Sequence, residues 1–243
     1  MSYIIAHNLV KEYGEGDMAV LAVRNMSFEV EAGEFVAVMG ESGAGKSTLL
    51  AMMGAMNPPT SGEYIVDDIP VYRLGRERRA DFRREFLGFV FQSFHLVPYL
   101  TVAENVMLPL VTLKASRRQK RAMAEEALDR VGLIDKANRL PNQISGGEKE
   151  RVAIARAIVN EPPVLLADEP TGNLDSKTSH IVMNLIQQLS QEGMTVVMVT
   201  HSTECAGYAK RVLQVSDGSL MWEDTLPGNQ RLPLHQAMCA KVG

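Results

Sequence analysis

The segment 40–47 constrains the fold of this chain more than any other part of the sequence. It reads Gly-Glu-Ser-Gly-Ala-Gly-Lys-Ser, between a short apolar run at 35–39 and a segment of helical character at 46–54. Glycines let backbone N–H groups turn inward around phosphate oxygens, and the start of a helix adds its positive end. A lysine here reaches the β- and γ-phosphates, and the serine after it binds Mg²⁺. The pattern therefore predicts a loop that binds a nucleotide with Mg²⁺ through Lys46 and Ser47.

Two acidic residues follow a second apolar run. Residues 164–167 are Val-Leu-Leu-Ala, and Asp168 and Glu169 come next. Ligands of a parallel α/β sheet bind at the carboxyl ends of its strands, so we expect both acids beside the phosphates. Asp168 would hold Mg²⁺ through its water shell, and Glu169 would orient, or accept a proton from, the water that attacks the γ-phosphate. Without the loop at 40–47, the same acids would be an ordinary exit from a strand.

A serine and two glycines at 145–147 precede a predicted helix over 146–160. Ser145 with Glu148 three residues later is typical of a capping box, which is a purely structural interpretation. The functional interpretation uses the same geometry, because a glycine-rich helix N-terminus offers several N–H donors to an anion. If this turn lies far from residues 40–47 within one chain, it serves the nucleotide of a second copy. That hypothesis predicts a head-to-tail dimer with two nucleotides at its interface.

The composition argues against other classes of protein. With 243 residues, of which 46% are hydrophobic, the chain can fold as one large α/β domain or as a core with a smaller inserted lobe. A protein held on nucleic acid by phosphate contacts usually has a basic excess, whereas this chain has a formal net charge of -4. The basic run at 73–84 also contains acids, and we interpret it as a solvated helix face. We therefore expect no nucleic-acid partner.

The cysteines and the apolar runs bear on the compartment. Cys205 and Cys239 lack the spacing of a metal site or of a disulfide framework, which fits a reducing compartment. The N-terminal segment has no apolar region typical of a signal peptide, and no apolar run approaches the ~20 residues that cross a bilayer. If the protein works at a membrane, we expect another subunit to do the crossing.

The order of the predicted elements indicates an α/β fold interrupted by helices. Strands are expected at 3–13, 20–30, 35–39, 63–66, 87–91, 164–167, 195–199, 212–215 and 220–222, and helices at 46–54, 101–113, 116–131, 146–160 and 176–192. Asp217-Gly218 indicates a hairpin. The apolar face of the last helix is predicted to contain Ile181, Val182, Leu185, Ile186 and Leu189. The helices within 93–160 predict a helical lobe inserted into a domain over 1–225, followed by a loosely held tail over 226–243.

Together these motifs resemble the ATP-binding-cassette (ABC) ATPase family over about residues 2–224. Residues 40–47 look like its Walker A motif, 144–148 like its LSGGQ signature, and 164–169 like its Walker B motif. The resemblance implies a P-loop NTPase (RecA-like) core with an N-terminal antiparallel β lobe and an inserted helical lobe. It also implies an ATPase that uses ATP and Mg²⁺.

The family resemblance extends to four smaller motifs. Gln92 matches the glutamine that senses Mg²⁺ and the transmembrane partner, and His201 matches the histidine that contacts the γ-phosphate. The D-loop is matched by residues 173–175, and Tyr13 stands where the family stacks an aromatic ring on adenine. Each residue also has a structural interpretation, such as a surface glutamine, a hydrogen-bonded histidine, a half-buried strand tyrosine, or a helix cap at Asp175.

The site expected from the motifs and the resemblance has three groups of residues. The catalytic residues are Lys46, Gln92, Glu169 and His201. The nucleotide-binding residues are Tyr13, Gly40, Glu41, Ser42, Gly43, Ala44, Gly45, Lys46, Ser47 and Thr48, with Ser145, Gly146, Gly147, Glu148 and Asp175 acting in trans. The magnesium-binding residues are Ser47, Gln92 and Asp168.

Segments 91–110 and 167–175 resemble one branch of the family, which contains the lipoprotein-release (LolD), macrolide-efflux (MacB) and cell-division (FtsE) ATPases. The branch implies a subunit that dimerises on ATP and drives an integral membrane permease from the cytoplasmic face. An alternative is a regulatory mechanical ATPase that acts on a membrane partner without transport. Glu148 departs from the usual Gln of the family and is similar to the lipoprotein-release members, and Ser202 departs from the Asp that commonly follows the histidine.

Overall fold

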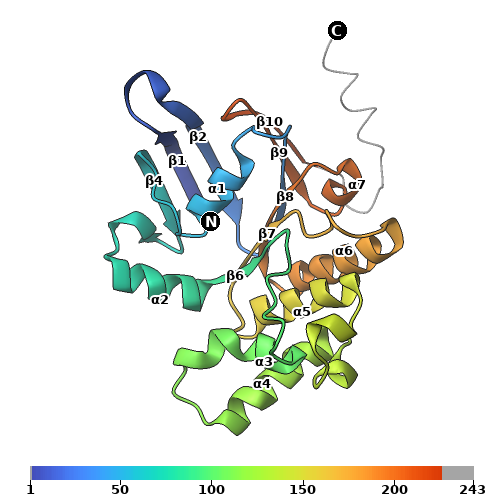
Figure 1. The fold of residues 1–243 in the computed structure, drawn as a ribbon. Helices are drawn as coiled ribbons and strands as arrows, with labels where there is room; N and C mark the ends of the chain where they lie inside the picture. Colours follow the sequence, from blue (N-terminus) through green and yellow to red (C-terminus); the bar gives the residue numbers. More distant parts are fainter. Residues whose placement is uncertain (1, 226–243) are drawn as a thin grey trace.

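The computed structural model describes residues 2–225, and the predicted tail over 226–243 lies outside this part of the chain. The described strands form two sheets (Figure 1). The first is antiparallel, in the order β2 (Val20–Glu31), β1 (Ser2–Tyr13), β4 (Ser61–Val66), β5 (Ile69–Pro70). The second has the order β10 (Ser219–Thr225), β9 (Arg211–Ser216), β3 (Phe35–Met39), β8 (Thr195–Thr200), β7 (Val164–Asp168), β6 (Leu87–Val90). All but β10 run parallel in this sheet.

The parallel sheet is buried on both faces, which explains why its strands are continuous apolar runs. Along β3, Phe35, Ala37 and Met39 pack into one core cluster, and Val36 and Val38 pack into the other. The first cluster includes residues of five helices, α3 (Val102–Met107), α4 (Arg117–Arg130), α5 (Gly146–Ile158), α6 (Ser176–Gln191) and α7 (Thr203–Ala206). The second joins the sheet to α1 (Lys46–Met53) and to the antiparallel sheet. The core therefore lies in two layers, one on each side of the parallel strands.

The elements segregate along the long direction of the molecule. Figure 1 shows the antiparallel sheet and α1 at one end and the helices α3 and α4 at the other. The helix α2 (Arg76–Phe86) leads into β6, and the short α7 (Thr203–Ala206) follows β8. No helix within residues 2–225 has both the length and the apolar character needed to cross a bilayer.

The hairpin predicted at Asp217-Gly218 is confirmed. Ser216 pairs with Ser219, and both intervening residues have positive φ, 47° for Asp217 and 79° for Gly218. Two positive φ values are what a two-residue turn between twisted strands requires. The hairpin joins β9 to β10 at the edge of the parallel sheet.

Two predictions about helices were wrong in detail. The helix expected over 101–113 ends as an α-helix at Met107 and continues as a 3-10 segment, Leu108–Thr112, because Pro109 lacks an N–H group and its ring obstructs the preceding turn. Ile181 was expected on the apolar face of α6, yet it is 48% exposed. The buried stripe of α6 consists of Val182, Met183, Ile186 and Leu189, and Ile181 lies beside this stripe.

Candidate functional site

The loop after β3 is held in shape by its own lysine. The Nζ of Lys46 donates to the main-chain oxygens of Gly40, at 2.8 Å, and of Glu41, at 2.7 Å. The Lys46 side chain is buried, and Ser47 at the start of α1 is exposed. No side chain caps the N-terminus of α1. The first N–H groups of this helix therefore remain available to an anion, together with the lysine charge.

Two positions of the loop require glycine because other backbone segments approach them closely. A Cβ on Gly40 would overlap the main-chain oxygen of Val215, and a Cβ on Gly45 would overlap that of Ala22. Gly45 also has a φ of +93°, which L side chains rarely adopt. The hairpin of β9 and β10 supports the loop, since the N–H of Gly218 donates to the oxygen of Ala44 at 3.1 Å.

The strand order brings the predicted catalytic residues to one edge of the sheet. β3 lies beside β8, β8 beside β7, and β7 beside β6, all parallel, so their carboxyl ends meet. The phosphate loop follows β3, His201 follows β8, Glu169 follows β7, and Gln92 follows β6 after Phe91. Segments separated by more than a hundred residues thus contribute to one site.

Glu169 is the centre of this edge. Its Oε2 lies 3.0 Å from Nδ1 of His201 and accepts a 3.4 Å hydrogen bond from Nε2 of Gln92. The carboxylate is mostly buried, with 19% exposure, whereas His201 is 65% exposed. Glu169 has a φ of 45°, and its N–H donates to the oxygen of Val199 at 2.9 Å. A strained backbone held by strand β8 therefore aims this carboxylate, as functional sites often do.

Asp168 ends β7 and is partly buried. Burial raises its pKa, the neighbouring charge of Glu169 raises it further, and the Lys46 ammonium counteracts both. Removal from water disfavours an unpaired carboxylate, and a cation beside it relieves that cost. A carboxylate, a serine hydroxyl and a glutamine amide are oxygen ligands that suit Mg²⁺, which also keeps several waters and binds phosphates. The residues present at this edge fit a magnesium ion bound with a nucleotide.

Two residues near Glu169 were not among the predicted site residues. Asn173 donates from Nδ2 to the main-chain oxygen of Gln92 at 2.9 Å, and thus links the segment after Glu169 to Gln92. A Cβ on Gly172 would lie 3.4 Å from both Nε2 of Gln92 and Oε2 of Glu169. Asn173 belongs to the segment 173–175 that was matched to the D-loop, and Gly172 directly precedes that segment; the sequence contains no other signal for either residue.

The turn at Ser145 has different neighbours from the phosphate loop. The Ser145 Oγ accepts from the N–H of Glu148, and the Glu148 carboxylate accepts from the N–H of Ser145, so the predicted capping box is confirmed. A Cβ on Gly146 would contact Leu174, and one on Gly147 would overlap Thr178. The bond from the Ser145 N–H, as the largest cause, holds the pKa of the Glu148 carboxyl below its ordinary value. The turn is therefore ordered by its own side chains and lies against the start of α6.

Asp175 occupies the N-cap of α6, as its structural interpretation predicted. Its Oδ1 accepts from the N–H of Thr178 at 3.0 Å, and its Oδ2 accepts from the Thr178 hydroxyl at 2.6 Å. These bonds lower the pKa of the Asp175 carboxyl. The residue is exposed, so its cap leaves it accessible to a second molecule.

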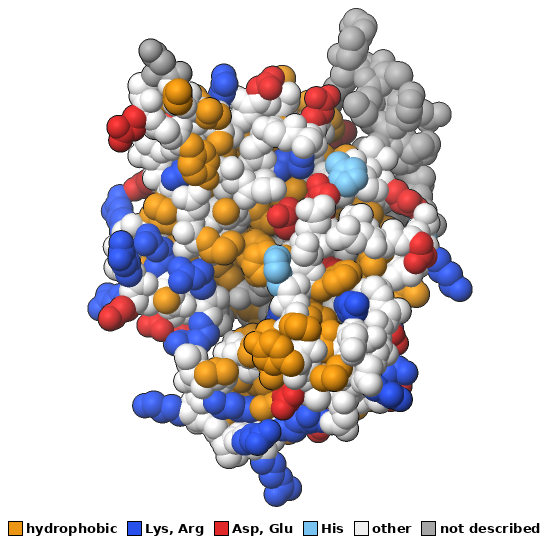
Figure 2. Space-filling view, viewed as in Figure 1, with side chains coloured by type: hydrophobic (Ala, Val, Ile, Leu, Met, Phe, Trp, Pro, Cys, Tyr) orange, Lys and Arg blue, Asp and Glu red, His pale blue; other side chains and the backbone are white. Residues whose placement is uncertain are grey.

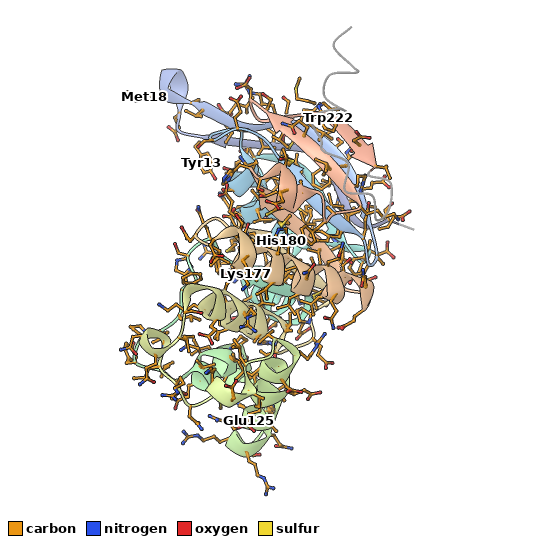
Figure 3. The ribbon with its side chains drawn as sticks, turned by 90° about the vertical axis from the view of Figure 1, so that its right-hand side faces the viewer. Tyr13, Met18, Glu125, Lys177, His180 and Trp222 are labelled. Carbon is orange, nitrogen blue, oxygen red and sulfur yellow. The ribbon has the colours of Figure 1, made fainter. Side chains whose placement is uncertain are left out.

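Tyr13 is the last residue of β1 and lies at the base of the hairpin tip that carries Met18 (Figure 3). The ring is 41% exposed, and the Lys11 ammonium lies 5.0 Å from its centroid. Its hydroxyl accepts a hydrogen bond from Nδ2 of Asn57, just beyond α1. An exposed aromatic ring anchored at one end is suited to stacking.

Comparisons with known proteins agree with this arrangement. The sequence pattern of the family described as ABC transporter matches residues 23–172. The uncharacterized ABC transporter ATP-binding protein MJ1508 of Methanocaldococcus jannaschii is 43% identical over 218 residues, which cover 90% of this chain and 97% of that protein. The macrolide export ATP-binding/permease protein MacB of Rhodopseudomonas palustris is 43% identical over 217 residues, 89% of this chain but 33% of that protein.

A solved structure is equally similar. The ATP-binding cassette MJ0796 of Methanocaldococcus jannaschii, in a dimeric post-hydrolysis state bound to ADP and phosphate, superposes with a TM-score of 0.85. It is 42% identical in sequence, and the match covers 93% of this chain and 99% of that one. The fold, the order of the motifs and these similarities show that this chain belongs to the ABC transporter family, as one of its ATP-binding proteins.

Proposed function

We propose that this chain is the ATP-hydrolysing subunit of a membrane transporter, that it works as a homodimer, and that the residues at the sheet edge carry the reaction. The observation that carries the proposal is the convergence of Gln92 and His201 on the carboxylate of Glu169, at the carboxyl edge of the strands that flank the phosphate loop. A carboxylate so placed can orient the attacking water or accept its proton. Similarity to the MJ0796 cassette bound to ADP and phosphate supports hydrolysis at this place.

Within the site, each residue has a distinct task. Lys46 and the N–H groups of residues 40–48 hold the phosphates, and Tyr13 stacks on adenine. Ser47, Gln92 and Asp168 would hold Mg²⁺, which would supply positive charge to neutralise the phosphates of the nucleotide. His201 contacts the γ-phosphate from the end of β8.

The second half of each nucleotide site comes from another copy of the chain. The Ser145 turn packs on Leu174 and Thr178, whereas Gly40 and Gly45 of the phosphate loop pack on Val215 and Ala22. We infer that Ser145, Gly146, Gly147, Glu148 and Asp175 contact the nucleotide of a partner subunit, arranged head to tail. ATP bridges the two subunits and ADP does not, so ATP favours the closed dimer. The dimeric structures of the related MJ0796 cassette support such an assembly.

The permease partner would bind the face between the two ends of the molecule. A groove of about 320 Å³ lies among α2, β6 and α5. Its lining combines apolar side chains with three arginines: Ala80, Arg83, Arg84, Leu87, Gly88, Phe89, Pro109, Arg156, Ala157 and Asn160. The adjoining segment exposes Tyr99, Leu108, Val111 and Leu113. Figure 2 shows hydrophobic side chains across the lower half of this face, with lysines and arginines along its left edge and lower rim.

Such a surface suits an amphipathic helix of an integral membrane protein. The branch likeness, with MacB as a fused ATP-binding/permease relative, supports a permease of the lipoprotein-release or macrolide-efflux kind. The chain would then sit at the cytoplasmic face of the membrane. We also propose one ATPase domain over 1–225, with a helical lobe over 93–160.

The test is the variant Glu169→Gln, which keeps the shape of the side chain but removes its basicity. We expect ATP binding to persist, hydrolysis to fall by at least about a hundred-fold, and an ATP-bound dimer to accumulate. Glu161→Gln is the control, because Glu161 is exposed and precedes the opposite end of the same strand. Full ATPase activity of Glu169→Gln would refute the assigned base. A monomer in saturating ATP would refute the dimer.

A further inference from the structure

Two helices begin beside the catalytic edge. The helix α6 starts after Asp175, and its first turn contacts the Ser145 turn through Thr178. The helix α7 starts directly after His201, with Ser202 as its N-cap. The orientation of His201 therefore depends on where α7 is held relative to its neighbours.

His180 joins these two helices by side-chain contacts. From α6, its Nε2 lies 3.1 Å from Oε1 of Glu204 on α7, and its Nδ1 lies 2.7 Å from the hydroxyl of Tyr208, just after α7. A carboxylate only accepts hydrogen bonds, so Nε2 is the donor to Glu204, and Nδ1 is left to pair with the Tyr208 hydroxyl. Both nitrogens of one ring thus bind the segment that follows His201. Figure 3 shows His180 on α6, close to Lys177.

The contacts of His180 with α7 are exposed to solvent, so we expect them to affect the position of α7 more than the stability of the fold. The side chain of His180 is 39% exposed and that of Glu204 is 63% exposed. Contacts so open to solvent add little to the free energy of unfolding. The segment after Glu169 is also joined to α7, because the Thr171 hydroxyl lies 3.1 Å from Sγ of Cys205. The short α7 is thus joined to α6 and to the segment that carries Glu169, while its Cys205 and Ala206 are buried in the core.

We infer that His180 is a positioning residue, which holds α7 against α6 and thereby places His201 beside Glu169. The inference rests on the proposed function, because it needs His201 to act at the nucleotide. It also links two sites of the proposed dimer, since α6 touches the Ser145 turn that serves the partner's nucleotide.

The test compares steady-state ATP hydrolysis by the full chain and by His180→Ala. Loss of a hydrogen-bonded positioning contact predicts a fall in kcat of about five-fold, with KM for ATP and the thermal midpoint of unfolding unchanged. His180→Gln, whose amide can donate to Glu204 and accept from Tyr208, should recover most of kcat. Tyr208→Phe should lower kcat in the same direction by less. In the double variant His180→Ala, Glu204→Ala, kcat should be no lower than in His180→Ala.

Gln187→Ala is the matched control, because Gln187 of α6 also donates to this region, at the main-chain oxygen of Tyr208. If the contacts of His180 are only structural, His180→Ala and Gln187→Ala should have equal effects, and kcat and the thermal midpoint of unfolding should fall together. That result would overturn the inference. So would a kcat of His180→Ala within about two-fold of the parent chain. Failure of the proposed function has a different signature: the parent chain would not hydrolyse ATP, or Glu169→Gln would stay monomeric with ATP.

Discussion

Two glycine-rich turns of this protein each precede a helix, and the N-termini of these two helices differ in how they are capped. At α1, the N-cap is Gly45 in a left-handed conformation, with no side-chain cap. At α5, the N-cap is Ser145, which exchanges hydrogen bonds with Glu148. The first helix start depends on Lys46 and leaves its N–H groups for a ligand, whereas the second is ordered without one. A turn capped by its own side chains can be ordered on the surface before another subunit binds. An uncapped turn with a buried lysine can bind an anion within one chain.

The two turns also differ in what surrounds them. Gly40 and Gly45 approach main-chain oxygens, whereas Gly147 approaches a methyl group of Thr178. Main-chain atoms cannot move without shifting a strand, but a side chain can be replaced. The phosphate loop is therefore the more constrained of the two.

The largest expected effect is a loss of ATP affinity, and it should differ between the lysines in the first turns of α1 and α5. Lys46→Ala removes the charge that binds phosphate and also the bonds to Gly40 and Glu41, and we expect ATP affinity to fall by about a hundred-fold. Lys149→Ala, in the first turn of α5, should leave ATP affinity of the monomer unchanged. Titration with a fluorescent ATP analogue measures both. Equal losses of ATP affinity in the two variants would contradict the distinction between a loop that binds ATP within one chain and a turn that contacts ATP only in a dimer.

The next effect concerns the dimer. Ser145→Arg, made in Glu169→Gln, should weaken the ATP-bound dimer by at least about ten-fold, because a bulky cation replaces a small hydroxyl at the contact with the partner's nucleotide. The monomer should still fold and bind ATP. Ser116→Arg is the control, since Ser116 caps α4 through the same capping box with Gln119. Sedimentation with ATP compares the two variants, and an intact dimer in Ser145→Arg would contradict use of the turn in trans.

A smaller effect concerns the glycines. Gly45→Ala and Gly147→Ala should each lower the free energy of unfolding by about 1–3 kcal/mol, because each added methyl group overlaps a neighbour. Adding Thr178→Ser, which deletes the obstructing methyl group but keeps the hydroxyl, should restore Gly147→Ala. No single side-chain change should restore Gly45→Ala, whose obstacle is a main-chain oxygen. Chemical denaturation measures all four chains, and a failed rescue of Gly147→Ala would be evidence against the packing on Thr178.

The smallest effect is a pH dependence at the Ser145 turn. The folded pKa of Glu148 lies below its unfolded value, so its stabilising contribution is present above the unfolded pKa, which is about 4.3, and is lost as pH falls through the folded pKa. Glu148→Gln keeps an oxygen acceptor but does not titrate. We expect the parent chain to be more stable than this variant by under about 1 kcal/mol at pH 7, with the difference shrinking as pH falls below the unfolded pKa and through the lowered folded pKa. A difference that grows on acidification would reverse the assigned sign.

Much of the fold could be predicted because local patterns and tertiary demands agree. The apolar runs at 35–39 and 164–167 became fully buried strands, since a parallel sheet covered on both faces excludes polar side chains. The hairpin at 217–218 followed from the conformational freedom of Asp-Gly. Pro109 was a visible signal against one long α-helix over 101–113. The exposure of Ile181 had no such signal, because a stripe of neighbouring apolar residues does not show where the buried face of the helix ends.

The sequence by itself determined which chemistry this protein can carry: a lysine-bearing glycine loop, a pair of acids after a strand, and a serine cap before a helix. These signals are local, and each depends on residues within a few positions of one another. Only the tertiary structure decided that Gln92 and His201 meet at Glu169, that Glu169 adopts a positive φ, and that His180 reaches α7. Such contacts follow from the order of strands in the sheet, which joins residues far apart in the chain and leaves no periodic trace in the sequence.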